Sequence, residues 1–337
     1  MGVRNPRRKR LASHCGCDYF VGMAHEPQTD PLLRRRTLPR GGERDFRTMA
    51  DGWPVRTWRW PAPDGRPTIL IITGRADFIE KYAETIHDLV DAGWGVASFD
   101  WRGQGLSRRL GQTPHHGASP GFAVWQSDLA EVIAWAGDGA PVLAMAHSMG
   151  GHLLLRHLVA GGQGISRAAL LAPMTGLAAK PLGPWLARTM ARWQVVLGHG
   201  GDYVWGGGPW EPGRPGERRQ AWLTSSVERY GDESWWIGQY PPLALGSVTW
   251  GWLDDAFAST AALGARGIPE AITTPLLALI PDRDALVDSA ATRRLIARIP
   301  GAGLELFAGA AHELLREVEP LRSDVLRHIL NFFGQAS

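Results

Sequence analysis

The segment Val142–Gly151 constrains the fold of this chain more than any other stretch. It reads Val-Leu-Ala-Met-Ala-His-Ser-Met-Gly-Gly, an apolar run that predicts a buried strand, followed by a helix over 151–159. Ser148 stands at the turn between the two. A sharp strand-to-helix turn exposes a serine hydroxyl and brings the next backbone N–H beside it. The segment therefore predicts a nucleophile elbow, with Ala146 in place of the first glycine of the usual G-x-S-x-G pattern.

A simpler role for Ser148 is to cap the helix that follows, because serine is a favoured N-cap residue. The later part of the chain argues against a cap alone. An acidic residue and a histidine follow Ser148, each after a predicted strand. The order serine, acid, histidine is typical of catalytic triads built around such an elbow.

The acid of this triad is expected in the polar turn 281–288, which follows a short apolar run that predicts a strand over 275–280. Asp284 is our preferred candidate and Asp282 the alternative. Asp288 is expected to cap the helix predicted over 290–299, because aspartate is a favoured N-cap residue.

The histidine is expected to be His312, which stands in a loop of small residues just after the predicted strand 304–307. At such a strand end it can reach across the top of a sheet. His147 is adjacent to Ser148 but is expected to point away from it, because neighbouring strand residues face opposite sides.

This chemistry needs all three side chains, because a serine hydroxyl is a poor nucleophile without a base. His312 would accept the Ser148 proton, and Asp284 would hold the imidazole in the right tautomer. The oxyanion formed on acyl attack needs N–H donors, each contributing about 3 kcal/mol. We expect these from the backbone of Met149 and of Arg75, which follows Gly74 after the predicted strand 68–72. A simpler interpretation is that Gly74 only provides an unusual backbone angle in an ordinary strand-to-helix loop.

Several further blocks, taken with these residues, resemble the monoacylglycerol lipase and lysophospholipase L2 group of α/β-hydrolases, also called the serine aminopeptidase S33 or hydrolase-4 family. The resemblance spans about residues 50–335. It implies an α/β-hydrolase fold, with a mostly parallel doubly wound sheet and an inserted helical cap. The blocks are Thr73–Arg75, Glu80–Tyr82, Asp100–Ser107, His147–Gly151, Gly251–Leu253, Ala256–Phe257, Asp284, Val287–Asp288, Gly309–Glu313 and Glu317.

The resemblance also gives Asp100–Ser107 a structural place at the sheet edge, so Asp100 and Arg102 are not expected to be catalytic. Many monoacylglycerol lipases carry His-Gly where this chain has Thr73–Arg75. That difference makes the bacterial lysophospholipase-like branch the nearer relative.

Short apolar strands alternate with longer helical patterns along the chain, which independently favours a mostly parallel sheet. About a hundred residues between Ala172 and Pro275 interrupt this rhythm, and so long an insertion is typical of a lid or cap. The expected parts are a basic, disordered leader (1–48), a first core part (49–175), the cap (176–272) and a second core part (273–337).

The expected cap is rich in tryptophan, whose apolar ring and single N–H suit the wall of an acyl pocket. Together these residues favour a hydrophobic acyl substrate, and Trp252 is expected to contact it. The cap tryptophans are Trp185, Trp193, Trp205, Trp210, Trp222, Trp235, Trp236, Trp250 and Trp252.

The first forty residues hold nine basic and three acidic side chains, so the rest of the chain is net acidic although the whole carries +3. This argues against a nucleic-acid-binding domain and leaves weak contact with anionic membrane lipid as an option for the leader. No apolar stretch is long enough to cross a bilayer, and no secretory signal is recognisable. Translation from Met23 or Met49 is another reading of this leader.

The only two cysteines, Cys15 and Cys17, lie in the leader without a second pair at zinc spacing. We therefore expect no metal site, no cofactor and a cytoplasmic location, because the folded part needs no oxidising compartment.

The combined expectation is a serine hydrolase that cleaves carboxylic esters of hydrophobic acyl groups, like a lysophospholipase or monoacylglycerol lipase, through an acyl-enzyme. One alternative is an aminopeptidase of the proline-iminopeptidase type, with Glu233, Asp254 and Asp255 holding a substrate amino group. A second is a non-catalytic binding protein on the same fold.

Overall fold

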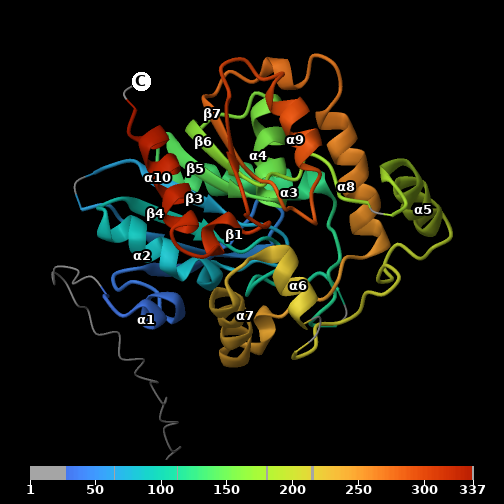
Figure 1. The fold of residues 1–337 in the computed structure, drawn as a ribbon, viewed down its shortest axis with the longest axis horizontal. Helices are drawn as coiled ribbons and strands as arrows, with labels where there is room; N and C mark the ends of the chain where they lie inside the picture. The colour runs from blue at the N-terminus through green and yellow to red at the C-terminus, as the bar shows by residue number, and fades with distance from the viewer. Residues whose placement is uncertain (1–27, 64, 112, 180, 214–215, 336–337) are drawn as a thin grey trace, which may run out of the picture.

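The computed structural model describes residues 28–63, 65–111, 113–179, 181–213 and 216–335. In these residues eight strands form one sheet in the order β1-β2-β4-β3-β5-β6-β7-β8 (Figure 1). The pairs β1–β2 and β2–β4 are antiparallel, and all other neighbours are parallel. The strands are β1 (Glu43–Thr48), β2 (Pro54–Trp60), β3 (Thr68–Ile72), β4 (Gly95–Phe99), β5 (Val142–His147), β6 (Ile165–Leu171), β7 (Leu276–Pro281) and β8 (Gly303–Phe307).

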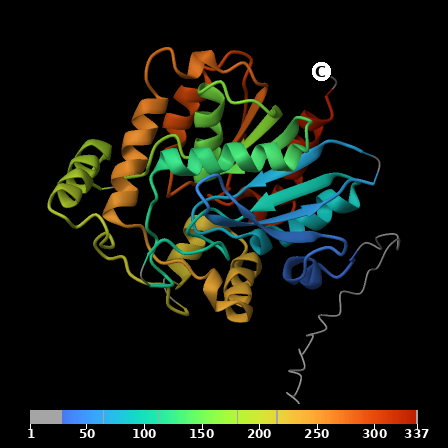
Figure 2. The same ribbon diagram turned by 180° about the vertical axis from the view of Figure 1, so that it is seen from behind.

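Helices cover both faces of this sheet, which confirms the predicted α/β-hydrolase class of a mostly parallel, doubly wound sheet. Helices α2 and α10 lie in front of the sheet in Figure 1, and α3 lies in front of it in Figure 2. The α-helices are α1 (Pro31–Arg36), α2 (Ala83–Asp91), α3 (Phe122–Gly137), α4 (Met149–Val159), α5 (Pro184–Val196), α6 (Gly216–Leu223), α7 (Val227–Gln239), α8 (Trp250–Leu263), α9 (Ser289–Ile296) and α10 (Leu321–Phe333). Short 3₁₀ helices are η1 (Ile79–Tyr82), η2 (Pro241–Leu243), η3 (Pro269–Ala271) and η4 (Leu314–Arg316).

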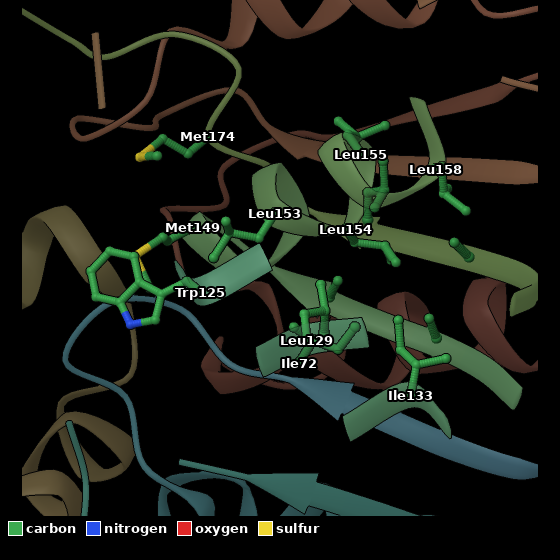
Figure 3. Packing of buried hydrophobic residues seen from close by; sticks show 14 of the residues in the cluster. Ile72, Trp125, Leu129, Ile133, Met149, Leu153, Leu154, Leu155, Leu158 and Met174 are labelled. Atoms are coloured by element: carbon green, nitrogen blue, oxygen red, sulfur yellow. The ribbon is translucent and has the colours of Figure 1, made fainter. Parts of the chain in front are cut away.

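The core consists of two apolar layers, one on each face of the sheet. Strand β3 shows why: Leu70 and Ile72 face the layer under α3, α4 and α8, while Ile69 and Ile71 face the layer under α2 and α10. A strand buried on both faces needs a continuous apolar run rather than an alternating one. Figure 3 shows side chains of the first layer, from Ile72 on the sheet to Trp125 on α3.

A buried ion cluster fixes the sheet edge next to this core. Arg56 of β2 donates to Asp100 at 2.6 Å and to both carboxylate oxygens of Glu80, at 2.6 and 2.8 Å. Arg102 pairs with Asp128 at 2.7 Å. Asp100 and Arg102 thus form internal ion pairs. This agrees with the structural rather than catalytic role that the resemblance implies for Asp100–Ser107.

The predicted disordered leader is wrong for its last part, because residues 31–36 and 43–48 form α1 and β1. Arg34 pairs with Asp88 and Asp91 of α2, each at 2.6 Å, and Arg35 pairs with Asp232 of α7 at 2.6 Å. These ion pairs order a segment whose composition alone suggested a free tail. The leader residues 1–27, with both cysteines and Met23, lie outside the described residues.

The predicted insertion lies between β6 and β7, and it contains α5, α6, α7 and α8. Its last helix does not behave as a cap, because α8 packs on α3 and α4 and places Ala256 and Leu263 in the first core layer. The expected cap boundary at residue 272 is therefore too late, since by packing α8 belongs to the core. Helix α5 packs against α8 at the outer side of the molecule, apart from α6 and α7 (Figures 1 and 2).

The cap tryptophans range from buried through half-buried to exposed. Trp236 and Trp250 are buried, whereas Trp185, Trp193 and Trp205 are 78%, 61% and 69% exposed. The exposed ones therefore do not line an enclosed acyl pocket in this structure. In the part of the chain that is described, we find no helix long and apolar enough to span a membrane.

Candidate active site

Ser148 lies at the end of β5 in the strained conformation that a nucleophile elbow requires. Its φ is 52° and its ψ is −116°, and a positive φ is uncommon for a residue with a side chain. Met149 begins α4 immediately afterwards, so the Met149 N–H belongs to the unpaired first turn of a helix. The turn thus presents the Ser148 hydroxyl beside free backbone donors.

The two glycines after the serine allow this turn to pack against the sheet. A Cβ on Gly150 would lie 2.4 Å from the carbonyl oxygen of Thr73, and one on Gly151 would lie 3.0 Å from Pro173 Cβ. Ala146, the departure from the usual pattern, is fully buried in β5 between β3 and β6. Close helix–strand contact therefore depends on the later glycines, and the methyl group of Ala146 is accommodated in the sheet.

The structure brings Ser148, His312 and Asp284 together from three separate strand ends. His312 Nε2 lies 3.0 Å from Ser148 Oγ, and His312 Nδ1 lies 2.7 Å from Asp284 Oδ2. The side chains of His312 and Asp284 are buried, while Ser148 keeps some exposure. This is the geometry in which a histidine can accept the serine proton while a carboxylate orients the ring.

Asp284 rather than Asp282 makes this contact. Asp284 Oδ1 also accepts the N–H groups of Leu286 and Val287, at 2.8 and 3.0 Å. Burial alone would raise the pKa of Asp284, but the adjacent His312 and these hydrogen bonds lower it, so the carboxylate stays ionised. Asp282 instead accepts the Gly309 N–H at 2.8 Å, and Asp288 caps α9 as predicted.

His312 gives the site a testable pH dependence. Burial alone would lower its pKa, but Asp284, with Glu313 and Asp77 nearby, raises the pKa above the usual histidine value of about 6.5. A catalytic base must be neutral, so we expect kcat/KM for an ester to fall with decreasing pH, with an inflection above about 6.5. A pH profile measured with a non-ionisable ester checks this, and an inflection below pH 6 would contradict it.

Asp77, which sequence reasoning missed, fixes the loop expected to supply the second oxyanion donor. Its Oδ2 accepts the Gly74 N–H at 2.9 Å and the Tyr82 hydroxyl at 2.8 Å. Gly74 itself has no room for a side chain, because a Cβ there would lie 2.8 Å from Asp77 and 3.3 Å from Ser148 Cβ. Asp77 thus holds the backbone before Arg75 close to the serine.

We expect Asp77→Asn to lower kcat about ten- to a hundredfold with a smaller change in KM, because a small displacement of oxyanion donors affects the transition state most. Steady-state kinetics on a soluble ester measures this. Asp45→Asn, on the exposed edge strand, is the control and should leave kcat unchanged. A proportionate rise in KM with unchanged kcat would contradict a positioning role for Asp77.

His147 is predicted to point away from Ser148, yet its imidazole contacts two loops of the site. Its Nδ1 lies 3.0 Å from Asp77 Oδ2, and its Nε2 lies 3.3 Å from the carbonyl oxygen of His312. Its imidazole therefore joins the oxyanion loop to the loop that carries the expected base. No hydrogen bond joins His147 to Ser148 among the described residues, and strand alternation gave no indication of the partners that both its nitrogens have on the neighbouring loops.

A buried group of charges ties these loops to cap helices α6 and α7. Lys81 contacts Asp77 and Glu313, each at 2.6 Å, and Glu233 of α7 at 3.0 Å. Glu233 also pairs with Arg219 of α6 at 2.9 Å. Burial alone would raise the pKa of Glu233, but these cations lower it strongly. Glu313 directly follows His312, so the cap is anchored beside the expected base.

The side chains of Arg75 and Trp252 contact each other. The Arg75 guanidinium lies over the Trp252 ring, 5.4 Å from its centroid. Trp252 is only 5% exposed and belongs to the first core layer, with Phe122 beside it. The expectation that Trp252 contacts substrate is therefore not met in this structure, because its ring is covered by Arg75 and the core.

The three carboxylates considered for an amino-group site do not come together as an open patch. Glu233 is surrounded by cations, as described above. On α8, Asp254 pairs with Arg192 at 3.2 Å, and Asp255 accepts the Ser119 hydroxyl at 2.9 Å. Within the described residues, no three His, Cys, Asp or Glu side chains group in a way that would hold a metal ion.

Comparison with known proteins agrees with this fold. A family model described as Hydrolase_4, serine aminopeptidase S33, matches residues 63–319. Lysophospholipase L2 of Escherichia coli K12 is 30% identical over 329 residues, which cover 94% of this chain and 92% of that protein. A probable lysophospholipase L2 of Haemophilus influenzae is 27% identical, covering 81% of this chain and 85% of its own.

Solved structures share the fold at lower identity. A soluble variant of monoglyceride lipase from Saccharomyces cerevisiae superposes with a TM-score of 0.67 at 18% identity, covering 86% of this chain and 95% of that one. A monoacylglycerol lipase from Paleococcus ferrophilus gives a TM-score of 0.64 at 19% identity, with coverages of 84% and 99%. At these identities the likeness establishes the architecture.

Proposed function

The chain belongs to the serine aminopeptidase S33 (Hydrolase_4) family, and from this premise we propose that it is a serine hydrolase that cleaves lysophospholipid-like carboxylic esters. The observation that carries the proposal is the hydrogen-bonded chain Ser148–His312–Asp284 at the carboxyl ends of parallel strands. Open α/β sheets place their ligand sites at this edge.

Each residue has a distinct role in the proposed mechanism. Ser148 Oγ attacks the ester carbonyl carbon while His312 Nε2 takes its proton, and Asp284 stabilises the resulting imidazolium. The N–H groups of Met149 and Arg75 donate to the oxyanion.

Collapse of the tetrahedral intermediate breaks the ester C–O bond, and His312 gives its proton to the departing alcohol. The acyl group then remains on Ser148. A water molecule, deprotonated by His312, attacks this acyl-enzyme by the same route and releases the carboxylic acid. This mechanism uses no metal or cofactor.

Lysophospholipase-like activity is favoured over the aminopeptidase alternative by the state of Glu233. An aminopeptidase needs an uncompensated carboxylate for the substrate amino group. Glu233 instead lies among Lys81, Arg219 and Arg316, at 2.9 to 3.4 Å. The related Escherichia coli protein carries the name lysophospholipase L2, which points the same way.

A substrate panel tests the proposal directly. It contains p-nitrophenyl esters, a monoacylglycerol, a lysophospholipid and a prolyl anilide, assayed with purified full-length protein. We expect turnover of the acyl esters and labelling of Ser148 by a fluorophosphonate, located by peptide mass spectrometry. Turnover of the anilide alone would replace the proposal with a peptidase, and the absence of both turnover and labelling would favour a binding protein.

We further propose a cytoplasmic location and, for the leader, weak contact with anionic lipid. The described residues contain no cysteine, so no disulfide within them needs an oxidising compartment. Arg34 and Arg35 are engaged in ion pairs, so such contact would depend on the basic residues before them, Arg4, Arg7, Arg8, Lys9 and Arg10.

A further inference from the structure

We propose that the side chain of Arg75 binds the phosphate group of the substrate and so selects phospholipid-derived esters over neutral glycerides. This inference rests on the proposed function, because it concerns the same site. It assigns the side chain a role separate from that of the Arg75 backbone N–H in the oxyanion hole.

The first observation is a cation without a counter-charge. No described carboxylate lies within ion-pair distance of the Arg75 guanidinium, whereas Arg56 and Arg102 each contact two. Burial lowers the pKa of Arg75 to about 10, so the group remains charged at neutral pH. A largely buried charge that lacks a partner is costly, and an anionic ligand would remove that cost.

The second observation is that the guanidinium is held in place through Nη2, while its other nitrogens remain available as donors. Its Nη2 donates to the carbonyl oxygens of Gly246 and Ser247, at 3.0 and 2.8 Å. Its Nε and Nη1 donate to no described residue. The N–H groups of Nη1 and Nε can therefore donate to anionic oxygens, and the charge of the guanidinium strengthens such hydrogen bonds.

The surroundings are shaped for this arginine. Gly117 leaves room for it, because a Cβ there would lie 2.2 Å from Arg75 Nη2. The guanidinium also stacks on the Trp252 ring. A fixed, stacked guanidinium loses little further conformational entropy when it binds a ligand.

The position of Arg75 matches the chemistry of a lysophospholipid. Its backbone follows Gly74, where a Cβ would lie 3.3 Å from Ser148 Cβ, so its side chain starts beside the scissile carbonyl. In a lysophospholipid the glycerol separates that carbonyl from the phosphate by a few bonds, a span comparable to an arginine side chain. Covering this cation with an acyl chain would cost free energy, because the charge would lose its contact with water. The polar end of the substrate is therefore expected here.

The test compares three esters with the same octanoyl chain, used below their micelle concentrations: 1-octanoylglycerol and its phosphoglycerol and phosphocholine derivatives. In Arg75→Gln we expect kcat/KM for both phosphodiesters, relative to 1-octanoylglycerol, to fall at least tenfold, chiefly through KM. Arg75→Lys should retain part of the preference, because it keeps the charge but not the planar guanidinium that stacks on Trp252. Fluorophosphonate labelling of Ser148 checks that the site in each variant is assembled.

Arg109→Gln is the matched control. Arg109 also holds the segment before α8, through the carbonyl oxygens of Pro242 and Ala244, and it has no carboxylate partner among the described residues. The phosphodiester preference should survive in this variant. Equal losses on all three esters in Arg75→Gln, or the same loss of preference in Arg109→Gln, would overturn the inference. Wild-type turnover of 1-octanoylglycerol alone would also overturn it while leaving ester hydrolysis standing, and turnover of none would remove the proposed function itself.

Discussion

Replacing Ser148 with alanine is expected to lower kcat for an ester by about four to six orders of magnitude, as loss of a triad nucleophile does in serine hydrolases. The reason is that no acyl-enzyme can form without the Ser148 hydroxyl, which lies 3.0 Å from His312 Nε2. Initial rates on a p-nitrophenyl ester, together with burst kinetics, measure the loss.

Ser323→Ala, on α10, is the control for this substitution because its hydroxyl contacts only Glu319 in the described residues. Its activity should match that of the wild type. Substantial ester turnover in a folded Ser148→Ala variant would mean that another residue supplies the nucleophile, and the proposed mechanism would then fail.

Replacing Asp284 with asparagine is expected to lower kcat by about 10⁴, because an amide group would stabilise the wrong tautomer of His312. The side-chain volume is preserved, and the oxygen that accepts the Leu286 and Val287 N–H groups can remain in place. The pH inflection of the residual activity should move to lower pH, because the carboxylate that raises the pKa of His312 is gone.

The neighbouring Asp282 offers a matched control, since it lies in the same turn and accepts only the Gly309 N–H among the described residues. Asp282→Asn should keep activity within a few-fold of wild type. If Asp282→Asn were the more damaging change, the assignment of the acid would have to be reversed.

The fold class and the three residues that meet at the site could be predicted because their signals are local. The apolar run of β5 followed by Ser148 and two glycines predicts an elbow without knowledge of any distant residue. Asp284 and His312 each follow a strand, and the ends of parallel strands meet at one edge of the sheet.

Contacts between distant segments could not be predicted in this way. Asp77 resembles any loop carboxylate in the sequence, and only the fold brings it to His147, 70 residues away. A weak signal was present, since Asp77 and Lys81 are four residues apart and opposite in charge. This spacing predicts an ion pair on a helix that contributes little to stability. It gives no indication that Asp77 also holds the oxyanion loop in place.

The same limitation explains the two errors in the expected domain boundaries, one at the end of the leader and one at the end of the cap. In the sequence, the arginines of α1 resemble a solvated basic tail. In the structure they form ion pairs with carboxylates of α2 and α7. The mixed apolar pattern of α8 could not distinguish a cap helix from one that packs on α3 and α4. Composition reports the charge and polarity of a segment, and its partners decide whether it is ordered.

The position of the insertion between β6 and β7 has a consequence for how this protein could diversify. These two strands are direct neighbours, so both ends of the insertion leave and re-enter the sheet side by side. A different cap could replace α5, α6 and α7 without moving Ser148, Asp284 or His312, as long as α8 stays packed on the core. Such a graft would have to bring its own equivalent of Glu233, because otherwise Lys81 and Arg316 would lose one of their buried counter-charges. The cap could therefore be exchanged while the triad stays in place, provided that the new cap preserves this buried charge balance.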